Sequence, residues 1–233
     1  MTNEGIRKTA ILFGFIALSV GIVSAYREPA TGFELSTYTA TPVVFWIGSC
    51  FALLVSVVVV FSDANKRMIM AGTFLGGFAM TTIVSLPIIR GYQYVGSQDS
   101  LSHLGTAIDM NAGLLSMTES RYPAVHMIGS VLSDATGLAL THVFLLVIVV
   151  FIAVFFAFIP LAVRRLTGDA TMTKIGVFAG LLLLPLNHVS PSTQIHPTSQ
   201  ALMFAPAFLF VFVSLYRNRT WRTSIIFVIT ALF

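Results

Sequence analysis

The sequence predicts an all-α, polytopic membrane protein, built as a bundle of transmembrane helices. Of its 233 residues, 56% are hydrophobic and only 9% are charged, whereas soluble globular domains carry roughly 25% charged residues. The mean hydropathy is +0.90. Apolar runs of roughly 17 to 25 residues recur along the chain, and a helix of that length crosses a bilayer. This composition excludes an ordinary soluble fold.

We expect six full spans followed by a truncated seventh. The seventh run, residues 225–233, is too short to span, because a membrane helix needs about 20 residues. The prediction is therefore a single transmembrane domain over residues 1–233 that is incomplete at its C-terminus. The six predicted full spans are residues 9–25, 42–61, 68–89, 138–163, 175–189 and 200–216.

Basic residues are concentrated in every second segment between the predicted spans. Lys and Arg near span ends are retained on the cytoplasmic side. With the N-terminus in the cytoplasm, ten of the thirteen basic residues fall on that side. We therefore expect a multi-pass protein of the cell membrane with its longest polar segment, residues 90–137, on the outer face. Topology and anionic lipid account for the net charge of +4, so no nucleic-acid partner is expected.

The polar segment is predicted to contain two amphipathic helices that lie in the membrane interface. In the first, Asp99 and His103 share the polar side, and Gly113 is expected to end the helix. The second is expected to begin at Pro123, because proline is favoured in a first helical turn. We expect the polar sides to face water and the apolar sides to face the acyl chains. The apolar side of the first helix consists of Leu101, Leu104, Ile108 and Leu115, and the polar side of the second consists of His126, Ser130, Ser133 and Asp134.

Three features of this segment occur in order: the run Asp99-Ser100-Leu101-Ser102-His103-Leu104, an amphipathic helix ending at Gly113, and Tyr122-Pro123 with His126 leading into a span. Together they resemble the outer loop of GT-C-type integral-membrane glycosyltransferases. Those proteins use a lipid-phosphate-linked sugar as donor and place an acidic residue in an outer loop near the bilayer surface. In that family the loop usually follows the first span, whereas here it follows the third. The resemblance implies transfer of a sugar from a polyprenyl-phosphate-linked donor at the outer face.

Glycosyl transfer to a hydroxyl needs a base for the acceptor proton and positive charge for the departing phosphate. Asp99 is the first candidate for the base, and His103 and Asp109 are the next catalytic candidates. A divalent cation, Mg or Mn, held by Asp99 and a neighbour is a possible source of positive charge. The candidate substrate-binding residues are Arg90, Arg121, His126 and His196.

Further observations concern the surroundings of this candidate site. The loop that carries His188 and His196 lies on the same predicted side, which allows these imidazoles to meet Asp99. A polyprenyl chain is expected to lie between spans, where the phenylalanine-rich residues 151–158 can meet it. For His126, a purely structural role is the alternative to substrate binding.

Two other function classes stay open. A transporter is compatible with the seven apolar runs, although the spans carry almost no charged residues, which usually mark ion paths. A non-catalytic membrane subunit or an inactive fragment is compatible with the short last run.

Overall fold

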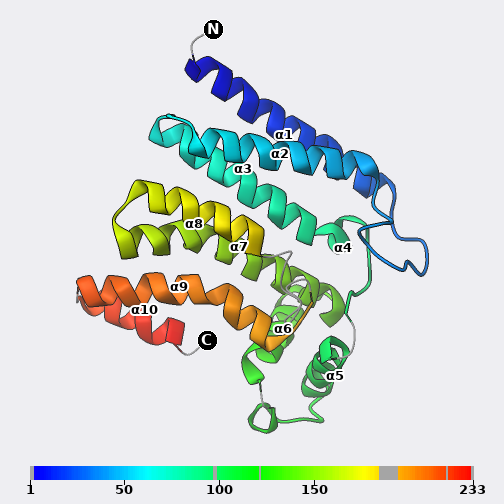
Figure 1. The fold of residues 1–233 in the computed structure, drawn as a ribbon. Coiled ribbons are helices and arrows are strands. Elements are labelled where there is room, and N and C mark those ends of the chain that lie inside the picture. Colours follow the sequence, from blue (N-terminus) through cyan, green and yellow to red (C-terminus); the bar gives the residue numbers. More distant parts are fainter. Residues whose placement is uncertain (1–2, 97–98, 121, 184–193, 219, 232–233) are drawn as a thin grey trace. The chain divides into compact units, whose positions relative to one another are not determined.

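The computed structural model describes residues 3–96, 99–120, 122–183, 194–218 and 220–231, which form helices with no strand among them (Figure 1). The chain divides into two compact units, Met1–Tyr92 and Gln93–Phe233. We call them the N-terminal unit and the C-terminal unit.

Five helices in the described part of the chain are long and apolar enough to cross a membrane. By length and composition the chain is therefore an all-α, multi-pass membrane protein, as predicted. Two further predicted spans correspond to shorter helices, α8 (Ala170–Leu183) with 14 residues and α10 (Trp221–Ala231) with 11. Part of the predicted span 175–189 lies outside the described residues, so the count of six full spans and a truncated seventh stays a prediction. The five long helices are α1 (Asn3–Arg27), α2 (Val43–Phe61), α3 (Lys66–Val84), α7 (Leu140–Thr167) and α9 (Pro197–Arg217).

In the N-terminal unit, α2 packs against both α1 and α3 (Figure 1). Gly48 lets α1 and α2 approach closely, because a Cβ at this position would lie 2.3 Å from the carbonyl oxygen of Ala17. Between α2 and α3, the Ser56 hydroxyl donates to the carbonyl oxygen of Gly72 at 2.7 Å. The buried hydroxyl is thereby satisfied in apolar surroundings. The fully buried side chains between these helices are Leu18, Ala52, Leu75 and Ala79.

The predicted third span, residues 68–89, is not one continuous helix. α3 ends at Val84, and a short helix, α4 (Leu86–Ile89), follows it. Pro87 explains the break, because proline has no N–H to donate to the carbonyl of Ile83 and its ring clashes with that carbonyl.

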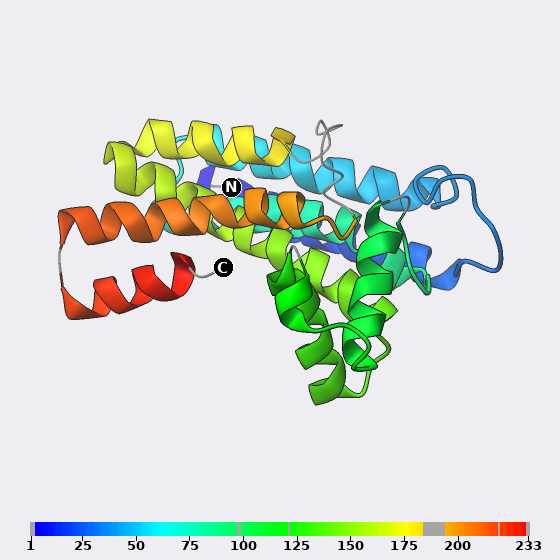
Figure 2. The same cartoon turned by 90° about the horizontal axis from the view of Figure 1, so that it is seen from below.

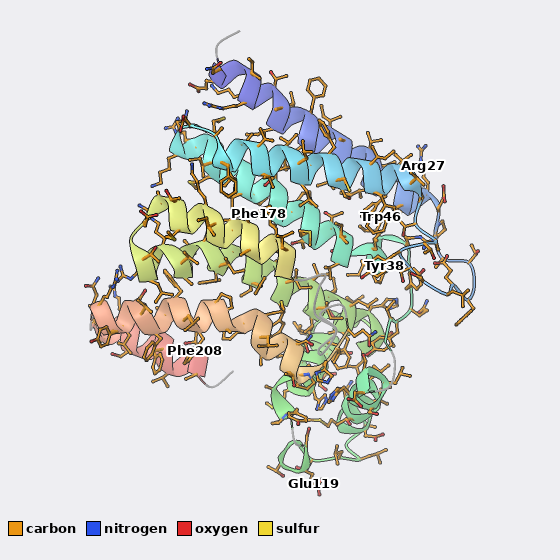
Figure 3. All side chains as sticks on the ribbon, viewed as in Figure 1. Arg27, Tyr38, Trp46, Glu119, Phe178 and Phe208 are labelled. Carbon is orange, nitrogen blue, oxygen red and sulfur yellow. The ribbon has the colours of Figure 1, made fainter. Side chains whose placement is uncertain are left out.

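In the C-terminal unit, α7 packs against α8 and α9, and α9 packs against α10. Figure 2 shows α9 and α10 side by side. The contact between α7 and α8 is close at Gly176, where a Cβ would lie 2.7 Å from the Val163 side chain. Aromatic rings hold α9 to α10, since the ring of Phe208 (Figure 3) lies 5.6 Å from that of Phe227, between centroids.

The polar segment folds into helices at both predicted positions. α5 (Asp99–Asn111) and α6 (Pro123–Thr136) are joined by a segment that contains the single-turn 3₁₀ helix η1 (Met117–Glu119). Gly137 ends α6 in the left-handed conformation, with φ of 70°, and its N–H donates to the carbonyl of Ser133 at 2.8 Å. Glycine adopts this conformation without a steric cost.

The side of α6 that was predicted to face water is in part buried. His126 is only 2% exposed, and Ser130 is buried as well. Between them on the helix, Gly129 lies so close to α7 that a Cβ would sit 2.1 Å from the Phe144 ring. The absence of a side chain at Gly129 therefore allows this polar stripe to pack against α7.

Candidate active site: a histidine cluster beside an apolar cavity

Histidines from two helices form a direct hydrogen bond in the C-terminal unit. His103 Nδ1 of α5 lies 3.1 Å from His126 Nε2 of α6, and His126 Nδ1 lies 3.0 Å from the Ser120 hydroxyl. Each hydrogen bond between two neutral imidazoles needs one protonated and one unprotonated nitrogen. Both ring nitrogens of buried His126 are thus satisfied, and the three side chains form a continuous line along which a proton can be passed.

A third histidine joins the cluster from the start of α9. His196 is the residue before that helix, and its backbone N–H donates to the Gln200 side chain at 2.9 Å. Its ring lies 5.9 Å from that of His103, between centroids, in an edge-on arrangement. Its Nε2 lies 3.8 Å from Asp99 Oδ2, within ion-pair distance.

Asp99 combines exposure with a neighbouring imidazole. It is the first residue of α5, and its side chain is 78% exposed. A reactant at the surface therefore has access to the carboxylate, while His196 lies beside it. The structure thus brings His196 to Asp99, as the sequence allowed.

Burial keeps the two hydrogen-bonded histidines neutral. Burial, with a smaller contribution from repulsion between protonated His103 and protonated His126, lowers the pKa of His126 to about 4. Burial also lowers the pKa of His103, with a further contribution from His196 that the Asp99 carboxylate opposes. At neutral pH both rings are therefore uncharged, and each can donate one hydrogen bond and accept another.

A cavity of about 350 Å³ lies next to this cluster, between the starts of α6 and α9 and the middle of α7. Tyr122 belongs to both, because it lines the cavity and its ring lies 6.0 Å from that of His103, between centroids. Pockets of this size hold small ligands or parts of larger ones. The lining is mainly apolar and comprises Tyr122, Pro123, Ala124, Val125, Ile128, Phe151, Pro197, Thr198, Gln200, Ala201 and Phe204.

The other predicted catalytic residue, Asp109, lies outside the cluster. It is exposed near the other end of α5, ten residues from Asp99, which corresponds to about 15 Å along a helix axis. Arg121 and His188 lie outside the described residues.

Arg90 belongs to the N-terminal unit and is engaged in a local network. Its side chain is 3% exposed and makes a two-pronged contact with the Glu34 carboxylate, at 2.7 and 2.8 Å. It also donates to the Glu28 carbonyl at 3.0 Å and to the Tyr92 hydroxyl at 3.1 Å. Four of the five guanidinium N–H donors are thereby used. These contacts explain the burial of Arg90, and its role in substrate binding stays a prediction.

The divalent cation expected at Asp99 stays a prediction. Asp99 and His196 bring together one carboxylate and one imidazole, and Mg²⁺ is commonly held by one or two carboxylates together with waters and substrate phosphates. The described part of the chain contains no group of three or more His, Cys, Asp or Glu residues suited to a metal ion.

Sequence reasoning missed two residues that support the cluster, Ser120 and Gln200. The signal for Gln200 lay in the run His196-Pro197-Thr198-Ser199-Gln200, which has proline in the first turn and a polar side chain one turn after the cap. Ser120 has no comparable local signal, because its contact depends on the burial of His126.

Comparisons with protein-family models, with curated proteins and with solved structures found no match to this chain.

Proposed function

We propose that this protein is an integral-membrane glycosyltransferase of GT-C type that transfers a sugar from a polyprenyl-phosphate-linked donor at the outer face of the membrane. The observation that carries the proposal is the convergence of an exposed carboxylate, Asp99, with three histidines beside an apolar cavity. A reaction between a lipid-linked donor and a polar acceptor needs both kinds of surface next to each other.

In the proposed reaction Asp99 is the general base. It takes the proton of the acceptor hydroxyl while that oxygen bonds to the anomeric carbon of the sugar. The bond between this carbon and the phosphate oxygen breaks, and the phosphate leaves on its lipid. His196, 3.8 Å from the carboxylate, positions Asp99, and the neutral imidazole of His103 offers a hydrogen-bond donor to the polar reactants.

The cavity is proposed to hold the first part of the polyprenyl chain. Its wall includes Phe151, one of the phenylalanines expected to meet such a chain, and Phe204. The rings of these two residues lie 6.3 Å apart, between centroids. Burial of hydrocarbon against such a wall contributes about 25 cal/mol for each Å² removed from water.

A transfer assay tests the proposal. The purified protein in liposomes is given a panel of undecaprenyl-phosphate-linked hexoses and pentoses with a sugar acceptor, and the labelled product is measured. We expect transfer from at least one donor and its loss in Asp99→Asn. Absence of transfer from every donor, with the protein folded, would favour a non-catalytic subunit.

A second variant tests the cavity. Ala201→Phe narrows it, and we expect a higher KM for the lipid donor with little change in kcat, because binding is lost equally in ground and transition states. Leu202→Phe is the matched control, since Leu202 is an exposed neighbour on α9 that does not line the cavity. Equal KM values for the two variants would contradict this role.

The transporter alternative is less well supported than the glycosyltransferase, because the five long helices carry few charged residues. Their Asp, Glu, Lys and Arg residues lie within two turns of the helix ends, and α2 has none. Ionisable groups within spans are the usual mark of a transport path.

A further inference from the structure

The loop between α1 and α2, residues 28–42, joins two long apolar helices at one end of the N-terminal unit. α1 ends at Arg27 and α2 begins at Val43. Because both helices are long enough to cross a bilayer, the loop that joins them lies at the membrane surface.

Two large apolar side chains project from this loop. Phe33 is 93% exposed and Leu35 is 94% exposed, more than any other large hydrophobic residue in the described part of the chain. An exposed phenylalanine presents roughly 150 to 250 Å² of surface that is suited to burial. In a loop without a partner this surface would be unfavourable in water.

Glu34, the residue between them, is held inside the loop by hydrogen bonds, which we call the Glu34–Arg90 clamp. The Glu34 carboxylate accepts two hydrogen bonds from buried Arg90 and one from the Tyr92 hydroxyl. The backbone of Arg90 also takes part, because its carbonyl accepts from the Ala30 N–H at 2.8 Å. The clamp neutralises the Glu34 charge and holds the loop so that Phe33 and Leu35 stay outside.

The rest of the loop has the composition of a membrane interface. No charged residue occurs between Glu34 and Val43. Tyr38 in the loop and Trp46 in the first turn of α2 form an aromatic pair, with ring centroids 6.0 Å apart and the indole N–H donating to the Tyr38 carbonyl at 3.2 Å (Figure 3). Tyr and Trp are enriched where membrane proteins meet the lipid headgroups. These features favour lipid over a protein partner as the occupant.

We propose that residues 28–42 form a membrane-interface anchor, in which Phe33 and Leu35 insert between the headgroups and the upper acyl chains while the Glu34–Arg90 clamp sets their direction. The anchor lies outside the proposed reaction site and is independent of the proposed function.

Site-directed fluorescence tests the anchor. Cys50, the single cysteine, is changed to serine, and bimane is attached to Phe33→Cys or Leu35→Cys in phosphatidylcholine vesicles that contain brominated lipid. We expect a blue-shifted emission and quenching by brominated lipid at both positions. The matched control is Asp63→Cys, in the exposed turn between α2 and α3, where we expect quenching by aqueous iodide. Quenching of all three labels by iodide alone would overturn the proposal.

A second variant tests the clamp. Glu34→Gln in the Phe33→Cys protein removes the charge that holds Arg90, and we expect loss of quenching by brominated lipid. A thermal melt in detergent identifies an unfolded variant, in which case Glu34→Asp replaces it and is expected to give a partial loss. Undiminished lipid quenching in a folded variant would show that the clamp does not direct the anchor.

Discussion

Acidification is expected to destabilise the C-terminal unit through His126. The ring is 2% exposed and accepts or donates hydrogen bonds at both nitrogens. Protonation would make both nitrogens donors and would place a charge in a buried site. The folded protein therefore resists protonation of this ring more than the unfolded chain does.

The size of this destabilisation follows from the pKa of His126 in the unfolded chain and in the folded protein. Burial, with a smaller contribution from His103, lowers the pKa of His126 from 6.5 to about 4, and each pKa unit corresponds to about 1.4 kcal/mol. Below about pH 6.5 the unfolded chain binds a proton that the folded protein does not bind until about pH 4. The free energy of unfolding is therefore highest above this window, and about 3 kcal/mol of it is lost as the pH falls through the window. The lowered pKa of His103 adds a loss of the same sign.

The assay is unfolding in mild detergent, followed by circular dichroism between about pH 7 and about pH 4. His126→Gln keeps hydrogen-bonding capacity without a titrating group, so its stability should depend less on pH than that of the wild type. The circular dichroism spectra of the wild type and His126→Gln at neutral pH show whether both proteins are folded. Equal pH dependence of the wild type and His126→Gln, or titration of the folded His126 ring near its ordinary pKa, would refute the reasoning.

Two substitutions, one of them with a matched control, test helix packing. Gly129→Ala places a methyl group 2.1 Å from the Phe144 ring and should lower the free energy of unfolding by about 1 to 3 kcal/mol. The control is Gly105→Ala, whose methyl group meets nothing within 4 Å and which should raise the free energy of unfolding slightly because alanine favours helix. Similar melting temperatures for the two variants would contradict the packing of α6 on α7. Gly48→Ala places its Cβ 2.3 Å from the Ala17 carbonyl oxygen, so it should destabilise the α1–α2 pair by a similar amount, and an unchanged melt would contradict that close approach.

Local patterns predicted the helices well, because a helix depends on residues within a few turns. Apolar runs identified the long helices, and Pro123 marked the start of α6. The break after Val84 was not predicted, since the run 68–89 is mostly apolar and carries no charged residue, so that Pro87 is the main signal for the interruption.

The candidate site was harder to predict because its contacts join distant parts of the chain. A helical wheel shows that His126 lies on a polar stripe, and it does not show that α7 covers the stripe at Gly129. The approach of His196 to Asp99 depends on the packing of α9 in the C-terminal unit. Asp109 borders the same side of the wheel as Asp99, but the length of α5 separates the two.

The proposed role of Asp99 as the base in sugar transfer is tested by comparing the transfer rates of Asp99→Asn and Asp134→Asn in liposomes. The two changes are chemically identical, and Asp134 is an exposed residue of α6. Loss of general-base catalysis should lower the rate in Asp99→Asn by roughly 10² to 10⁴-fold, with Asp134→Asn close to the wild type. Equal rates for two folded variants would contradict the assignment of Asp99.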